Sequence, residues 1–296
     1  LWHSGRLLIV ERGEYSGKGG GWNAPTEQIS IRSVGPDPTF LHGLLAEIQD
    51  VRGAQRSKTV DVFLYRSYWR LACRKPKRAL DSVILPPEQL ARIVGDIDRF
   101  LGARDWYTKR GVPYRRGYLL EGPPGCGKTS LVMALAGHFR RPVYALNLGS
   151  LPNDDALIEA VTSVPEHAIL LIEDIDATEA SATRTTVEPG GIGEKKEEAK
   201  ALMLSGLLNA IDGVFSRDGR ILVMTTNHPD KIDPALLRPG RADVREHLGY
   251  LQRREVLAMC RQFVEDPCEA AEIAEGIQEP IAPAELQGRL LLGARS

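Results

Sequence analysis

Residues 117–139 read GYLLEGPPGCGKTSLVMALAGHF, and this stretch decides the fold. Its centre satisfies the pattern G-x-x-x-x-G-K-[ST] with Gly122, Gly127, Lys128 and Thr129. The residues before the pattern predict a buried strand, and those after it predict an amphipathic helix. Glycines let the backbone wrap so that several N–H groups point at phosphate oxygens, and the helix adds its positive N-terminal end. The stretch therefore predicts a phosphate-binding loop between a strand and a helix.

We expect this loop to bind a nucleoside triphosphate, with ATP and Mg²⁺ as the ligands. The expected binding residues are Gly122, Pro123, Pro124, Gly125, Cys126, Gly127, Lys128, Thr129 and Ser130. Lys128 would reach the β- and γ-phosphates, and the Thr129 hydroxyl would be a ligand of Mg²⁺. Cys126 is interpreted as a tolerated small residue rather than a redox switch, although a helix N-terminus does lower a thiol pKa.

A second apolar run, in residues 167–177 (HAILLIEDIDA), ends in three carboxylates. Burying Glu173, Asp174 and Asp176 at a strand end would be costly unless a cation met them. Mg²⁺ bound to the triphosphate is the expected cation, because in P-loop enzymes the acidic strand end lies beside the phosphate loop.

Successive side chains on a strand point to opposite faces, so Glu173 and Asp174 should have different roles. We expect Glu173 to be a metal ligand and Asp174 to activate the attacking water, although the sequence leaves the reverse assignment open. A capping cluster at the strand end is the structural alternative. For Asp176, local hydrogen bonding and support of the metal site both stay open.

Two later segments add candidate catalytic residues. ILVMTTNHPD places Asn227 at the end of a further strand, and KIDPALLRPGRAD contains Arg238 and Arg241. A polar amide at a strand end can orient the attacking water or contact the γ-phosphate, but a lone Asn is more often a turn residue. An arginine that completes the active site of a neighbouring subunit raises the rate of phosphoryl transfer by about 10³–10⁵-fold. Two isolated surface arginines, by contrast, indicate no particular function.

Composition excludes several classes of protein. The chain has 296 residues, 43% hydrophobic and 26% charged, as in globular proteins and unlike disordered ones. Its net charge of −1 gives no overall attraction to nucleic acid or acidic membranes. The four cysteines form no CxxC pair, which predicts reduced thiols rather than a disulfide framework or a zinc site. No apolar run reaches the roughly 20 residues needed to span a bilayer.

The order of apolar segments predicts three regions. Residues 1–75 should form a small α/β domain, residues 76–250 the nucleotide-binding domain, and residues 251–296 a small helical domain. In the large region the strand candidates are GYLLEG, RPVYALNL, HAILLIED, GRILVMTTN and VREHLGY. Their alternation with helices predicts an α/β fold with a doubly wound, mostly parallel sheet. The basic run 74–78 is expected to be a solvated hinge, and 178–199 a mobile surface loop.

Together these elements resemble the AAA family of ring ATPases, from the phosphate loop and acidic strand end to TTNHPD, DPALLRPGRAD and a helical lid. The resemblance implies that Asn227 is the first sensor. It also implies that Arg238 and Arg241 are fingers that reach the nucleotide of the adjacent subunit. Copies of the chain would then form a homo-oligomeric ring, a heptamer or a hexamer.

The resemblance is sharper to the Bcs-type branch of that family, on DWYTKRGVPYRRGYLLEGPPGCGKTSLVMALAG, ILLIEDIDA, SGLLNAIDGV and MTTNHPDKIDPALLRPGRAD. Members of the branch translocate the folded Rieske iron–sulfur protein during assembly of respiratory complex III. The Glu-Asp order of the acidic pair is a habit of the branch, so it is no sign of a dead site. The match covers about residues 70–250, and residues 1–75 resemble the branch-specific domain loosely. The loop EASATRTTVEPGG departs from the mitochondrial members, so a bacterial relative with another client is the alternative.

The implied function is that of an ATP-hydrolysing chaperone or translocase that moves a folded protein client. The segment GSLPNDDA contains no aromatic residue with which to grip an unfolded chain, and this favours a folded client. One alternative is a nucleic-acid-dependent motor or loader, against which the near-zero net charge and the lack of a basic–aromatic stripe speak. Another is a nucleotide-gated scaffold with incidental turnover.

Location is expected to follow from the family. Because the chain opens on Leu1 and not Met, the sequence leaves open a preceding segment through which the ring would associate with a membrane. For a eukaryotic member the expected place is the mitochondrial inner membrane, facing the matrix. For a bacterial member it is the cytoplasm or the inner membrane.

Overall fold

The computed structural model divides into two compact units, Leu1–Lys58 and Thr59–Ser296. The residues described are 2–3, 6–15, 26–33, 40–45, 47, 58–176, 206–212 and 218–293. The predicted surface loop 178–199 and the glycine-rich stretch 16–22 lie outside them. No helix among the described residues is both long enough and apolar enough to cross a bilayer.

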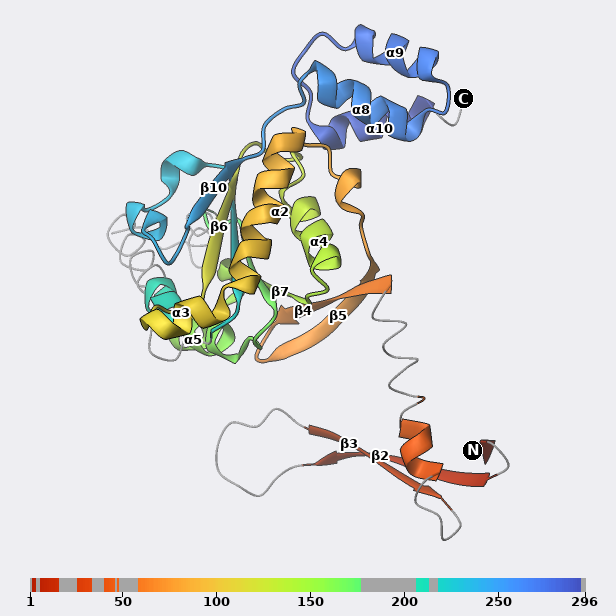
Figure 1. The fold of residues 1–296 in the computed structure, drawn as a ribbon, viewed down its shortest axis with the longest axis vertical. Coiled ribbons are helices and arrows are strands. Elements are labelled where there is room, and N and C mark those ends of the chain that lie inside the picture. Colours follow the sequence, from red (N-terminus) through yellow and green to blue (C-terminus); the bar gives the residue numbers. More distant parts are fainter. Residues whose placement is uncertain are drawn as a thin grey trace, which may run out of the picture. The chain divides into compact units, whose positions relative to one another are not determined.

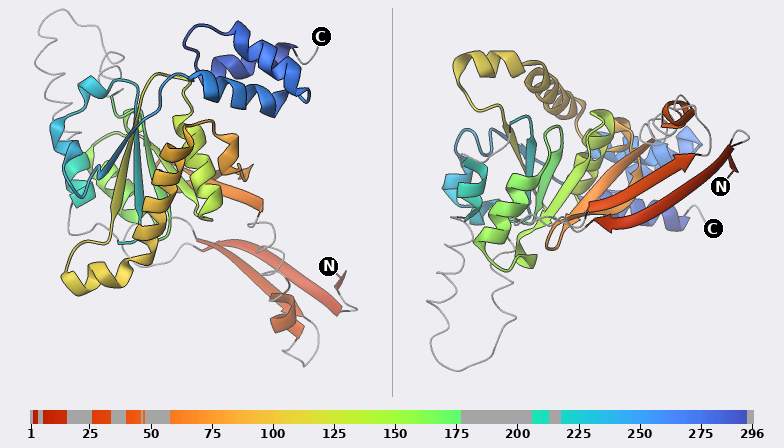
Figure 2. Two further views of the ribbon diagram at one scale, coloured as in Figure 1. Left: turned by 45° about the horizontal axis from the view of Figure 1, so that its top comes forward. Right: turned by 90° about the horizontal axis from the view of Figure 1, so that it is seen from below.

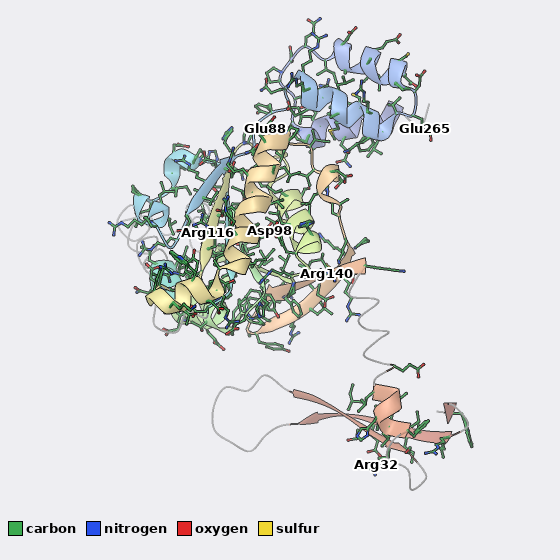
Figure 3. The ribbon with its side chains drawn as sticks, viewed as in Figure 1. Arg32, Glu88, Asp98, Arg116, Arg140 and Glu265 are labelled. Carbon is green, nitrogen blue, oxygen red and sulfur yellow. The ribbon has the colours of Figure 1, made fainter. Side chains whose placement is uncertain are left out.

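The first unit contains a three-stranded antiparallel sheet and a short helical stretch at residues 40–45. Its strands are β1 (Trp2–His3), β2 (Arg6–Tyr15) and β3 (Thr26–Ser33). Val10 and Ile31 are paired across β2 and β3, and Leu8 is buried. Arg32, labelled in Figure 3, forms an exposed ion pair of 2.8 Å with Glu11. The expected small α/β domain is therefore present.

The second unit is built on a seven-stranded sheet in the order β10-β6-β9-β8-β7-β4-β5. Its strands are β4 (Thr59–Tyr65), β5 (Trp69–Pro76), β6 (Arg116–Glu121), β7 (Val143–Asn147), β8 (Ile169–Glu173), β9 (Ile221–Thr226) and β10 (Val244–His247). Every neighbouring pair is parallel except β4 and β5. The predicted mostly parallel sheet is confirmed, and it places the ends of β6, β8 and β9 at one edge.

Helices cover both faces of this sheet, as the right-hand view of Figure 2 shows for α2 and α5. One face carries α2 (Pro87–Gly102) and α4 (Lys128–His138), and the other carries α5 (Asp154–Ser163) and a helical stretch at 206–212. Neighbouring strand residues alternate between the two cores. Leu120 and Leu171 pack with α2 and α4, whereas Leu119 and Leu170 pack with α5. Burial on both faces explains the unbroken apolar runs in the sequence.

Helix α4 is not amphipathic, contrary to the expectation from its sequence. Residues 134–137 are all buried, and successive residues lie about 100° apart around a helix. The helix is enclosed because the loop between η1 (Leu80–Ser82) and β5 also lies over it, with the Arg78 carbonyl 3.4 Å from where a Cβ of Gly137 would be. The phosphate loop is thus attached to a helix that is fixed on nearly all sides.

Polar contacts fix α2 to β6 and to the edge strand β10. Asp96 accepts hydrogen bonds from Arg116 at 2.8 and 2.9 Å and from the Tyr118 hydroxyl at 2.6 Å (Figure 3 labels Arg116). Arg92 donates to the buried carboxylate of Glu246 on β10 at 2.7 and 2.9 Å. Burial and the contact with Asp96 raise the pKa of Tyr118, so its hydroxyl stays a donor.

The boundary predicted near residue 75 differs from the division into compact units after Lys58. Strand β4 pairs with β7 and β5 pairs with β4, so residues 59–76 belong to the large sheet by their main-chain hydrogen bonds. Arg74 and Lys75, expected in a hinge, lie instead on the edge strand β5, where Arg74 pairs with Asp61. Charged residues on an edge strand discourage pairing with other chains.

The chain ends in a bundle of three helices, as expected for the lid. They are α8 (Arg253–Phe263), α9 (Pro267–Gly276) and α10 (Pro283–Gly293), and they share a separate core around Cys260 and Leu286. Ile84 packs against this core, and Gln262 donates to the Asp81 carbonyl at 2.7 Å. The segment DSVIL therefore lies between the large domain and the lid.

Candidate active site

The phosphate-loop residues adopt a backbone that requires glycine. Gly122, Gly125 and Gly127 have φ values of +137°, +79° and +88°. A Cβ on Gly122 would also lie 2.0 Å from the Leu248 carbonyl oxygen, so no other residue fits there. Loops of this kind direct backbone N–H groups toward one concave side. This backbone fits the predicted phosphate cradle between β6 and α4.

Lys128 is buried within the loop, with 7% of its surface exposed. Its ammonium donates to the Gly122 carbonyl at 2.6 Å, to the Pro123 carbonyl at 3.0 Å and to Oδ1 of Asn227 at 2.7 Å. These contacts use all three donors of the ammonium. Burial lowers the pKa of Lys128, and the charge of nearby Asp174 opposes that shift. A phosphate group arriving here would exchange for these oxygens.

Thr129 and Glu173 meet where we expected a metal. The Thr129 hydroxyl donates to Oε1 of Glu173 at 3.0 Å, which joins the start of α4 to the end of β8. Oxygen donors of this type suit Mg²⁺. Among the described residues no three His, Cys, Asp or Glu side chains gather as a metal site of their own.

Asp174 points to a different partner from Glu173. Its carboxylate accepts a hydrogen bond from Nδ2 of Asn227 at 3.1 Å, and its backbone N–H donates to the Thr225 hydroxyl at 3.1 Å. Asp174 has a φ of +48°, a conformation that Asp tolerates better than most residues. The acidic pair is therefore divided, with Glu173 beside the predicted metal ligand and Asp174 beside the predicted sensor.

Asp176 is engaged in local hydrogen bonding. Its Oδ1 accepts from the Thr226 hydroxyl at 2.8 Å and from the Asn227 backbone N–H at 3.2 Å. Thr226 is fully buried, so this contact is shielded from water. Of the two roles left open by the sequence, these contacts favour local hydrogen bonding. Their effect is to fix the backbone that carries Asn227.

The two arginines after β9 differ in their surroundings. Arg238 follows η4 (Pro234–Leu237), is exposed, and has no side-chain partner among the described residues. The Arg241 side chain is only 14% exposed, and its guanidinium donates to Asp212 at 2.6 Å and to the Ala235 carbonyl at 2.7 Å. The predicted pair of fingers is thus one exposed arginine and one arginine held within the subunit.

Several contacts at the site have weak sequence signals. The Ala284 N–H at the start of α10 donates to the Gly125 carbonyl at 3.2 Å, which connects the lid to the phosphate loop. Arg78 donates to the Ser130 hydroxyl at 3.1 Å from the segment expected to be a hinge. A backbone donor leaves no trace in a sequence. Asp212 lies within the quoted segment SGLLNAIDGV, but only the fold brings it to Arg241.

The site combines four features: a phosphate loop after a strand, an acidic strand end, a sensor-like amide and a helical lid. This combination defines a P-loop ATPase domain of the AAA type. Accordingly, residues 118–250 match the family described as ATPase family associated with various cellular activities (AAA). Residues 1–83 match a second family, described as BCS1 N terminal, which extends across the unit boundary to the end of β5 and beyond.

Similarity to whole proteins extends along almost the entire chain. It is 38% identical to human "Mitochondrial chaperone BCS1" over 306 aligned positions, which cover 99% of this chain and 71% of the relative. The Schizosaccharomyces pombe "Probable mitochondrial chaperone bcs1" is 38% identical over 92% of this chain and 60% of its own length. The Arabidopsis thaliana "Protein HYPER-SENSITIVITY-RELATED 4" is 34% identical over 80% of this chain and 44% of its own length. The chain belongs to the BCS1 family of AAA ATPases.

Proposed function

We propose that this protein hydrolyses ATP with Mg²⁺ and uses the energy, as a homo-oligomeric ring, to move a folded protein client. The observation that carries the proposal is the Asn227 side chain, which bonds at once to Lys128 and Asp174. The predicted phosphate ligand, sensor and base, drawn from α4, β8 and the end of β9, thereby form one continuous set of contacts.

In this proposal the residues divide the work of hydrolysis. Lys128 binds the β- and γ-phosphates, and Thr129 and Glu173 hold Mg²⁺. When bound, Mg²⁺ neutralises charge that develops on the phosphate oxygens. Asp174 accepts a proton from water as the water oxygen attacks the γ-phosphorus and ADP leaves. Asn227 orients that water.

Support for a ring and a protein client comes from the family and from two local features. The human and fission yeast relatives are named mitochondrial chaperones, which favours a mitochondrial location and a protein substrate. Arg238 is exposed and available to a neighbouring subunit. The segment GSLPNDDA, at the start of α5, has no aromatic side chain with which to hold an unfolded chain. A folded client, of which the Rieske iron–sulfur protein is the family example, fits these features best.

The test measures phosphate release and nucleotide retention by the purified protein and two variants. Lys128→Ala should lose both, and Asp174→Asn should retain ATP without hydrolysing it. Hydrolysis should rise when the folded client is added, and a stable domain fused to the client should stay folded during turnover. Stimulation by DNA or RNA that falls with salt would instead favour a nucleic-acid motor. A slow rate that no client changes would favour a scaffold.

A further inference from the structure

We propose that Arg241 acts inside its own subunit, as a positioning residue, and that Arg238 alone reaches the neighbouring nucleotide. The inference rests on the proposed ring ATPase and deepens it. It departs from the expectation that both arginines are fingers.

Arg241 has three hydrogen-bond partners in its own subunit among the described residues. Its Nε donates to Oδ2 of Asp212 at 2.6 Å, and its Nη1 donates to the Ala235 carbonyl at 2.7 Å. Its backbone N–H also donates to the Arg238 carbonyl at 3.1 Å. A finger must exchange its resting partners for phosphate oxygens in each cycle. If a mostly buried guanidinium left its carboxylate in each cycle, the carboxylate would lose one of its charged partners each time.

Asp212 serves a second arginine, which makes it the centre of the cluster. Its Oδ1 accepts from Nη2 of Arg115 at 2.9 Å, and Arg115 also donates to the carbonyl of Ile211. One carboxylate thus lies between two guanidinium groups, each less than a quarter exposed. Moving Arg241 away would disturb the contact between the helical stretch 206–212 and the start of β6.

The backbone of the loop is anchored independently of the Arg241 side chain. Asp243 accepts from the Gly240 N–H at 2.7 Å and from the Gly117 N–H of β6 at 2.9 Å. A Cβ on Gly117 would lie 1.5 Å from the Arg241 carbonyl oxygen, so the loop backbone lies directly against the strand. These contacts fix the backbone of residues 240–243. The Arg241 side chain adds a second attachment through Asp212 and the Ala235 carbonyl.

Arg238 has the opposite character. It is exposed, it precedes the anchored residues, and no side-chain partner competes for it among the described residues. A rigid loop is a suitable support for a guanidinium that acts across an interface. The reason is that a misplacement of about 1 Å can lower the rate by about 10²-fold. The function of the Arg241–Asp212 pair is therefore to hold this support.

The decisive experiment is amide hydrogen exchange without nucleotide, because a finger has nothing to contact in that state whereas an internal pair does. Arg241→Ala and Asp212→Ala should each raise exchange several-fold in the peptides that cover 206–212 and 238–243. Arg238→Ala and the exposed lid variant Arg254→Ala should leave both peptides unchanged. If Arg241→Ala fails to fold, Arg241→Lys takes its place in the experiment. Arg241→Lys keeps the charge with fewer donors, so it should raise exchange in both peptides by a smaller factor.

Turnover supplies the second readout. Arg238→Ala should lose about 10³-fold or more in kcat, as removal of a finger does. Arg241→Ala and Asp212→Ala should each lose less kcat than Arg238→Ala does, and their two losses should be similar. The double variant should lose no more than either single variant. Unchanged exchange in Arg241→Ala together with a kcat loss equal to that of Arg238→Ala would overturn the inference. If the wild-type protein hydrolyses no ATP, the proposed function fails while the exchange data still decide whether the pair holds the loop.

Discussion

The amide oxygen of Asn227 lies 2.7 Å from the Lys128 ammonium, and its amide nitrogen lies 3.1 Å from the Asp174 carboxylate. One side chain thus connects the phosphate-binding residue to the proposed base. A phosphate group that draws Lys128 away would free the Asn227 oxygen while its nitrogen still bonds Asp174. This exchange offers a direct route by which nucleotide binding sets the position of the base.

We therefore expect Asn227→Asp to retain ATP and lose turnover. The new carboxylate would still accept from Lys128, but it would repel Asp174 and could no longer donate to it. Loss of one such donor lowers kcat by about 10²–10³-fold in comparable sites. Steady-state phosphate release and binding of a fluorescent ATP analogue would check this. A variant with normal kcat would remove Asn227 from the chemistry.

Glu173 and Asp174 should give different defects. Glu173→Gln weakens the oxygen set shared with Thr129, so hydrolysis should require more Mg²⁺. Asp174→Asn keeps the metal side intact, so its Mg²⁺ requirement for nucleotide binding should match that of the wild type while hydrolysis stops. A Mg²⁺ titration of binding and turnover in both variants separates the roles. Exchanged phenotypes would mean that Glu173 is the base.

Asp176 should affect kcat and not KM for ATP. Asp176→Ala removes the acceptor of the Thr226 hydroxyl and of the Asn227 N–H, so the sensor loses its support and kcat should fall by about 10-fold or more. Asp176→Asn keeps an oxygen at the same place and should retain most of the activity. Equal losses in the two variants would indicate that the charge, and thus a metal-directed role, matters.

The sequence and the structure agree best where the chemistry is local. The phosphate loop, the strands that flank it and the lid helices follow from patterns within a few residues. The pairing of β4 with the large sheet could not be predicted, because TVDVFLYR reads the same in a small domain as next to the edge strand of a large sheet, and only its pairing with β7 distinguishes the two. Likewise, Arg241 reads as a surface arginine until the fold brings Asp212, 29 residues away, to within 2.6 Å.

The four cysteines should react at two different rates. Cys73 and Cys268 are exposed, whereas Cys126 and Cys260 are buried, and burial raises the pKa of each buried thiol. A raised pKa lowers the thiolate fraction at any pH below it, and the thiolate is the reacting form. Pulse alkylation at pH 8 followed by mass spectrometry should therefore modify Cys73 and Cys268 first. Rapid modification of Cys126 would show that the phosphate loop opens readily.

Two glycine substitutions should shift stability in opposite directions. Gly125→Ala forces a side chain into a backbone with φ +79° and places its Cβ 3.4 Å from that of Ala284 on the lid, so it should destabilise by about 1–2 kcal/mol. Gly95→Ala lies within helix α2 with nothing within 4 Å, so it should stabilise by about 0.5–1 kcal/mol. Thermal unfolding should show a lower Tm for the first variant and a higher Tm for the second. Because the two changes add the same methyl group, a common shift in one direction would contradict the backbone argument at Gly125.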